Sequence, residues 1–316
     1  MLDLAPSTDP SAIQDKNSDT AGEHADIVEI LALVRARGIS EMEFKRLLQR
    51  QAGPDLDDDI AEAAAADAFE RLEQRGRRLK SAYPFVVSGN TVKRRTSFAR
   101  SWPYRFMLTV QRHDMSSKYR RHRKLDPTRL FERLCRYSVA GFLCPDLTAE
   151  ECSVVLGSTR RDEHTPGDFD SVLDTVLGGI GTTDTRRPGI RAPGGGDGGI
   201  DIVCWRRFAD DRLPGAVTVF GQCKTGKGWH LDLHTLTIPS QFLARYTLGA
   251  SDCPVPVSAF MVPACIESRS AHADYARRGQ VYLFDRLRIA QFALRIPKSL
   301  AKDCDTWTTE ALANAT

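Results

Sequence analysis

The sequence of 316 residues contains no apolar run of the roughly 20 residues that a membrane-spanning helix needs. Its first residues, MLDLAPSTDPSAIQDKNSDTAGEH, are acidic and polar, without the basic start and apolar stretch of a secretory signal peptide. We therefore expect a cytoplasmic protein with no membrane partner, and a disordered tail over residues 1–25.

Metal-binding cysteine pairs and a phosphate-binding loop are also missing. None of the eight cysteines belongs to a CxxC pair, so a zinc ribbon is excluded. Reduced thiols packed as small apolar side chains are expected instead. The chain contains no Walker A motif, which argues against an intrinsic ATPase.

Acidic residues are almost absent from residues 75–124, where Asp114 alone stands against 15 lysines and arginines. Residues 1–74 show the opposite bias, with 17 Asp and Glu against 7 Lys and Arg. The formal net charge of +3 hides this segregation. A basic block of this density is typical of contact with a polyanion.

The second half of the basic block, residues 96–125, is predicted to be a basic linker that binds nucleic acid. Aromatic residues are interleaved with its cations: Phe98, Trp102, Tyr104 and Phe106. Cations neutralise backbone phosphates and aromatic rings stack on bases, so the combination favours DNA as a partner. The expected phosphate-binding residues are Lys118, Arg120, Arg121, Arg123 and Lys124.

Residues 26–95 are predicted to form a mostly helical domain. Helical spacing is found at 27–38, 40–53 and 58–76, and a hairpin turning at 88–90 follows. Ser40 and Glu43 are spaced as a capping box at the start of the second helix. Three helices followed by a basic hairpin is the element order of a winged-helix-like domain, although a small helical packing domain has the same pattern.

Residues 126–300 are predicted to form an α/β domain with a mixed sheet flanked by helices, followed by a C-terminal tail at 301–316. Helical and strand-like patterns alternate along it. The expected helices cover 126–143, 167–181, 238–247 and 268–278, and the expected strands cover 152–159, 199–205, 216–225 and 257–262, with a last strand–helix unit at 281–294.

Two of these strand-like runs carry polar residues that an ordinary hairpin does not need. Asp201 lies in GGIDIV, and Gln222 and Lys224 end the run VTVFGQCK. If the two strands pair antiparallel, a register that places Asp201 beside Gln222 and Lys224 is easily formed. Carboxylate, amide and peptide oxygens, including the Cys223 carbonyl, suit Mg²⁺ or Mn²⁺. The Lys224 ammonium can orient the attacking water and stabilise the charge of a phosphoryl transition state.

Asp201 and Gln222-Cys223-Lys224, separated by twenty residues, resemble the PD-(D/E)xK phosphodiesterase superfamily, in particular its Mrr-like restriction endonuclease branch. Glutamine often replaces the second acidic residue there. The glycine-rich lead-in GGDGGIDIV and the ending VFGQCKTG are similar to the same branch. The resemblance covers about residues 126–295 and implies a restriction-endonuclease-like fold.

The resemblance further implies an acidic residue on the first core helix. Glu132 in LFERL is the candidate, and Asp170 in DFDSVL is the alternative. The implied activity is that of a Mg²⁺-dependent deoxyribonuclease, an endonuclease of bacterial restriction or anti-phage defence, working with DNA and with a defence-system partner protein or a second copy of itself. The competing hypothesis is a non-catalytic DNA-binding or regulatory protein on a nuclease-like scaffold.

Other polar residues near the motif are weaker candidates for the site. Asp197 is interpreted as a turn residue or an outer helper, and Lys227 is a second lysine that competes with Lys224 if the strand ends early. His230 and His234 have the i, i+4 spacing of metal ligands, but no third ligand with suitable spacing accompanies them, which favours surface or core histidines.

Overall fold

The structure is a computed structural model that describes most of the chain. The described residues are 2–9, 20–53, 56–96, 101–116, 121–156, 169–181, 185–187, 199–208, 216–236, 238–248 and 255–313. They form a mixed α/β protein of two compact units, each described by itself below. Unit 1 is made of Met1–Leu125, Pro263–His272 and Asp303–Thr316, and unit 2 of Asp126–Val262 and Ala273–Lys302. None of the helices in these ranges is long and apolar enough to cross a membrane.

Unit 1 contains the predicted helices and the predicted hairpin. Its helices are α2 (Thr20–Val34), α3 (Glu41–Ala52), α4 (Asp58–Leu79), the short η2 (Lys80–Ala82) and α5 (Trp102–Arg112). Its strands are β1 (Ile39–Ser40), β2 (Phe85–Ser88) and β3 (Thr91–Arg94), which form an antiparallel sheet in the order β1-β3-β2. The capping box is present, since Glu43 N–H donates to Ser40 Oγ at 3.2 Å and Ser40 N–H donates to Glu43 Oε2 at 2.9 Å.

The N-terminal tail differs from the prediction in two places. The first helix begins at Thr20, so residues 20–25 belong to α2. Leu2 is buried, and Asp3 N–H donates to the carbonyl of Arg112 at 2.7 Å. Residues 2–9 are therefore packed onto α5 at their start, because an apolar side chain and a backbone bond fix them there.

The predicted basic linker contains a core helix. In α5 the rings of Tyr104 and Phe106 are fully buried, so the interpretation of these two aromatics as base-stacking residues is wrong. The predicted C-terminal tail is also helical, as α12 (Lys298–Ala313). Trp307 of α12 is fully buried with its ring 5.6 Å from that of Phe106. Both segments therefore contribute to the core of unit 1.

A buried ion network joins distant parts of unit 1. Arg75 of α4 is fully buried, and its guanidinium donates to Glu267 Oε1 at 2.6 Å, Asp26 Oδ1 at 2.8 Å and Glu29 Oε2 at 2.9 Å. The hydroxyl of Tyr83 donates to Glu29 Oε1 at 2.6 Å. Burial and the neighbouring Glu29 raise the pKa of Tyr83 well above its ordinary value. Each of these carboxylates is thus bonded to a buried cation, which makes its burial tolerable.

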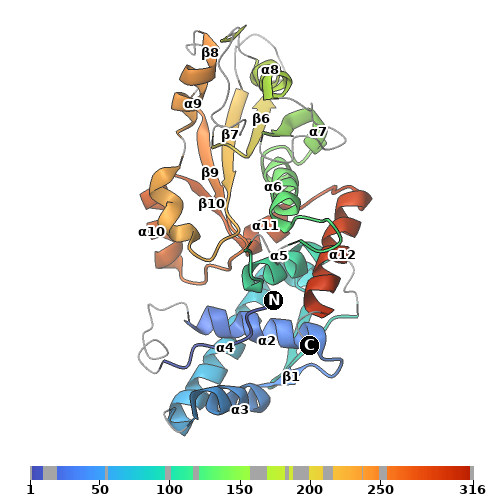
Figure 1. The fold of residues 1–316 in the computed structure, drawn as a ribbon, viewed down its shortest axis with the longest axis vertical. Helices are drawn as coiled ribbons and strands as arrows, with labels where there is room; N and C mark the ends of the chain where they lie inside the picture. Colours follow the sequence, from blue (N-terminus) through green and yellow to red (C-terminus); the bar gives the residue numbers. More distant parts are fainter. Residues whose placement is uncertain are drawn as a thin grey trace. The chain divides into compact units, whose positions relative to one another are not determined.

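Unit 2 contains a five-stranded mixed sheet in the order β10-β9-β7-β6-β4. Figure 1 labels four of its strands, β10, β9, β7 and β6. Its strands are β4 (Ser153–Val155), β6 (Ile202–Arg207), β7 (Ala216–Cys223), β9 (Val257–Met261) and β10 (Tyr282–Phe284). Strands β4, β6 and β7 pair antiparallel, and β7, β9 and β10 pair parallel. A separate two-stranded sheet pairs β5 (Thr185–Arg186) with β8 (Thr247–Leu248). The predicted antiparallel hairpin of β6 and β7 is confirmed.

Helices supply the other elements of unit 2. They are α6 (Pro127–Leu143), α7 (Ala149–Cys152), α8 (Phe169–Ile180), the 3-10 helix η5 (Trp229–Thr235), α9 (Pro239–Tyr246) and α11 (Arg286–Phe292). The helix α10 (Arg269–Gly279), like α12, contains residues of both units. The predicted order of helices and strands is therefore present, with α7, η5 and the small second sheet as additions.

One face of the five-stranded sheet is covered by α8 and α9. Val203, Trp205 and Phe220 lie on it in one buried cluster with apolar residues of both helices. Helix α8 comes so close that a Cβ on Gly179 would lie 2.3 Å from the ring of Trp205, which explains the glycine there. Alternation places the Cys223 side chain on the opposite face from Phe220.

Candidate active site

The pairing of β6 with β7 fixes the position of Asp201. The register ends with Ile202 opposite Gly221, and Asp201 is one residue before β6. Asp201 stays next to β7, because its N–H donates to the carbonyl of Gly221 at 2.9 Å. Alternation along β7 projects Gln222 to the opposite face from Cys223, and Lys224 is two residues beyond Gln222. The structure therefore brings Asp201, Gln222 and Lys224 together at the end of the hairpin.

The carboxylate of Asp201 is anchored to the backbone of the neighbouring strand. Its Oδ2 accepts the N–H of Cys223 at 2.6 Å, and the residue is half-buried. The backbone of Lys224 is still bonded to β9, since its N–H donates to the carbonyl of Met261 at 3.0 Å. The acidic side chain is thus held at the N–H of Cys223, the residue between Gln222 and Lys224.

The ammonium of Lys224 lies beside a carboxylate that the sequence analysis missed. Its Nζ is 3.5 Å from Oδ2 of Asp232 in η5, and the two side chains are 39% and 45% exposed. An ion pair this exposed is weak, so Lys224 can exchange Asp232 for another anion at small cost. Asp232 lies between the two histidines of HLDLH, and its position two residues from each was the only signal in the sequence that could have pointed to it.

Glu132 is a buried acidic residue on α6. It is 5% exposed, which is rare for a glutamate. Burial raises the pKa of the Cys223 thiol well above its ordinary value; the thiol of Cys135 on α6 raises it further, as do the carboxylates of Asp201 and Glu132. Both carboxylates therefore lie within electrostatic range of one sulfur atom. Glu132 therefore lies near the Cys223 thiol, whose side chain projects to the opposite face of the sheet from that of Gln222.

Asp170, the alternative helical acid, has a different environment. It begins α8, and its Oδ2 accepts a hydrogen bond from Nη1 of Arg186 at 2.7 Å. The Asp170 side chain is 47% exposed and forms a surface ion pair. This geometry separates the two candidates, since Glu132 is buried beside the hairpin cysteine and Asp170 is bound to an arginine of the small second sheet.

The oxygen atoms at the end of the hairpin fit a hard divalent cation. Asp201 supplies a carboxylate, Gln222 an amide oxygen and Cys223 a peptide oxygen, and Mg²⁺ and Mn²⁺ prefer such ligands. Across the described ranges, no group of three or more His, Cys, Asp and Glu side chains could hold a metal ion. An ion at this site would therefore depend on the amide, the backbone, water and a substrate phosphate for its remaining ligands.

The other predicted site residues are distributed as follows. Arg121, Arg123 and Lys124 are exposed, and Nη2 of Arg123 forms an ion pair with Glu310 of α12. Lys118, Arg120 and Asp197 lie outside the described residues, as does the side chain of His234. Lys227 is exposed, and the exposed His230 has its ring 5.7 Å from that of Trp229.

Comparison of this chain with protein-family models, curated proteins and solved structures finds no match.

Proposed function

We propose that the protein is a metal-dependent DNA endonuclease that hydrolyses phosphodiester bonds. The observation that supports the proposal is that Asp201, Gln222 and Lys224 lie together at the end of the β6–β7 hairpin, while Glu132 is a buried acidic residue on α6. Asp201 also accepts the Cys223 N–H and Lys224 also pairs with Asp232, but both interactions leave donor or acceptor capacity for other partners. Oxygen ligands for a cation and an ammonium beside them are the groups that metal-assisted hydrolysis of a phosphodiester uses.

The order of elements in unit 2 supports the same proposal. Helix α6, strand β4, the β6–β7 hairpin, helix α9 and strand β9 follow one another as the resemblance to the PD-(D/E)xK superfamily implies. The order of elements in unit 1 supports a winged-helix-like domain. The elements follow one another as α2, β1, α3, α4, β2 and β3, and the strands form a sheet in the order β1-β3-β2. A role in restriction or anti-phage defence, with a defence partner or a second copy of the chain, comes from the resemblance.

The chain's own residues have distinct parts in the proposed reaction. Asp201 and the oxygens of Gln222 and Cys223 would hold a divalent cation, Mg²⁺ or Mn²⁺, which would supply Lewis-acid activation when bound. Lys224 leaves its weak pair with Asp232 and donates hydrogen bonds to the phosphate oxygens and the attacking water. Glu132, buried near the Cys223 thiol, would add negative charge to the site and favour a bound cation.

Plasmid and linear DNA incubated with Mg²⁺, Mn²⁺ or EDTA test this proposal. The wild-type protein should cleave only with the metal. Asp201→Asn keeps an oxygen for the Cys223 N–H and removes the charge, so cleavage should fall roughly a thousandfold or more. Glu132→Gln should also lower cleavage, whereas the matched control Asp170→Asn, at a surface ion pair, should not.

Two further variants separate chemistry from folding. Lys224→Ala should abolish cleavage and leave the thermal melt unchanged, because the side chain is 39% exposed. Gln222→Glu should remain active with a changed metal preference. Equal cleavage by wild type and Asp201→Asn would refute the proposal. Metal-independent DNA binding with no cleavage under any condition would instead favour a non-catalytic DNA-binding protein.

A further inference from the structure

The exposed side of α4 in unit 1 is acidic along most of its length. Its exposed acidic residues are Asp58, Asp59, Glu62, Asp67, Glu70 and Glu73. No lysine or arginine between Asp58 and Glu73 is exposed on this fully described part of the helix. This is the third helix of the winged-helix-like arrangement, and its charge would be repelled by a phosphate backbone.

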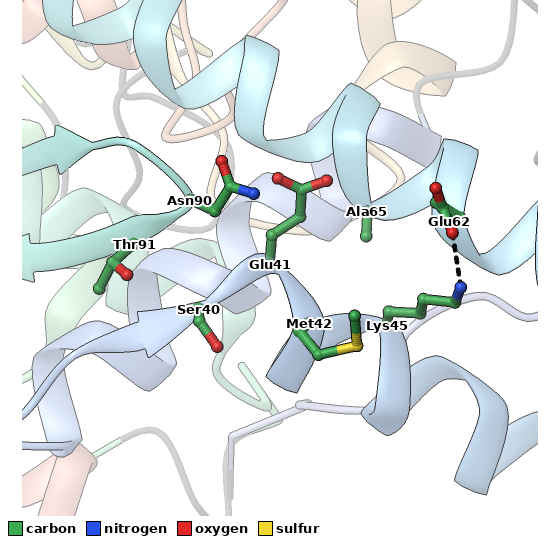
Figure 2. Close-up of a pocket in the computed structure, with 8 residues that line it drawn as sticks. All are labelled: Ser40, Glu41, Met42, Lys45, Glu62, Ala65, Asn90 and Thr91. Carbon is green, nitrogen blue, oxygen red and sulfur yellow. Dashed lines mark hydrogen bonds and ion pairs between the residues drawn. The ribbon is translucent and has the colours of Figure 1, made fainter.

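The hollow beside α4 is also lined by acidic residues (Figure 2). It encloses about 270 Å³ and is lined by Ser40, Glu41, Met42, Lys45, Glu62, Ala65, Asn90 and Thr91. The only lysine on its walls, Lys45, already donates to Asp58 Oδ2 at 2.9 Å and to Glu62 Oε2 at 2.7 Å. Those carboxylates raise the pKa of Lys45, and Glu41 adds a further negative charge. A phosphate is therefore disfavoured here.

The hairpin that follows α4 has the opposite charge. Its exposed or half-exposed cations are Lys93, Arg94 and Arg95, hereafter the hairpin cations. The sequence has no Asp or Glu from Arg75 to His113. Arg95 is held at the base of the hairpin, where its Nε donates to the carbonyl of Phe85 at 3.0 Å.

The fold fixes the strand that carries these cations. In β3, both Lys93 and Arg94 pair with β2, and no acidic residue separates them. Strand β3 is also packed tightly against Gly38, since a Cβ there would lie 2.1 Å from the carbonyl oxygen of Val92 and 2.8 Å from Cγ of Lys93. Like charges held together on a fixed strand favour a polyanion that neutralises them.

We infer that unit 1 binds the phosphate backbone of duplex DNA through the hairpin cations, and that the acidic side of α4 does not enter a groove. The inference rests on the proposed function in taking DNA as the partner. Salt-sensitive phosphate contacts dominate such binding, and they carry no direct base readout. Unit 1 would therefore hold DNA of any sequence, and base recognition by α4 is not expected.

The test measures binding of a labelled DNA duplex in EDTA, so that cleavage has no influence. The test variant is Lys93→Ala with Arg94→Ala. The matched control is Arg46→Ala with Arg50→Ala, which removes the same charge from two exposed arginines on α3 of the same unit. Each lost phosphate contact is worth roughly tenfold in affinity at about 0.1 M salt. The test variant should lose between roughly tenfold and a hundredfold, and its salt slope should fall by up to about two.

The control should change affinity by less than about twofold, because the inference depends on position and not on net charge. Equal losses in the two variants, or no loss in either, would overturn the inference while leaving the cleavage test at Asp201 unaffected. Tighter binding after Asp59→Asn with Asp67→Asn, by more than about tenfold, would also overturn it, because α4 would then lie against the phosphates. Thermal melts of all variants should agree, since every substituted side chain is exposed.

Discussion

His113 should make the folded protein less stable as the pH falls from 6.5 to 4. The ring is 2% exposed, its Nδ1 lies 2.8 Å from the carbonyl of Asp114, and its Nε2 lies 3.2 Å from Nε2 of His122. Burial is the main reason that the pKa of His113 falls from 6.5 to about 4. Within this range the unfolded chain takes up a proton that the folded chain does not, so acid favours unfolding.

The size of the effect follows from the two pKa values. The difference between 6.5 and about 4 corresponds to roughly 3 kcal/mol, of which about 2.5 kcal/mol is lost between about pH 7.5 and about pH 4.5. His113→Phe keeps a ring against Trp307, 5.3 Å from the present one, and cannot titrate. Urea unfolding at a series of pH values should therefore show a smaller pH dependence in this variant than in the wild type.

A second histidine provides the comparison. Burial also lowers the pKa of His24, whose Nε2 lies 2.8 Å from the carbonyl of Ser7. Both histidines thus contribute to the pH dependence of the wild-type free energy of unfolding. The His24→Phe variant should keep the contribution of His113, which the His113→Phe variant loses. The reasoning would be refuted if wild type and His113→Phe lost the same free energy of unfolding between about pH 7.5 and about pH 4.5.

Three substitutions test the packing of unit 1 by urea unfolding. Arg75→Met should lower the free energy of unfolding by about 3–5 kcal/mol, because Glu29 and the other buried carboxylates lose their cation; a change near zero would contradict the buried network. Trp307→Ala should cost about 3–5 kcal/mol, and wild-type stability in this variant would mean that the C-terminal helix is not part of the core. Ser40→Ala removes the side-chain cap of α3 and should cost about 1 kcal/mol, whereas an unchanged midpoint would show that the bond to Glu43 N–H contributes nothing.

Local patterns in the sequence were sufficient to predict several elements and the side chains of the candidate site. The capping box at Ser40, the helix that contains Glu132 and the hairpin that contains Asp201 and Lys224 each depend on residues close together in the chain. Successive side chains along a strand project to opposite faces of the sheet, and this alternation does not depend on what packs around the strand. For that reason Gln222 and Lys224 could be assigned to one face before the pairing register was known.

Contacts between distant segments decided the rest. The aromatic residues of α5 were expected to face nucleic acid, but Tyr104 and Phe106 are buried, and Trp307 from the far end of the chain packs on Phe106. The burial of Glu132, and its distinction from Asp170, likewise came only from the fold. Burial depends on which segments meet across the core, and periodicity within one segment carries no information about its partner. The sequence alone therefore determined which groups were available for chemistry, and the tertiary structure decided which of them came together and which became core.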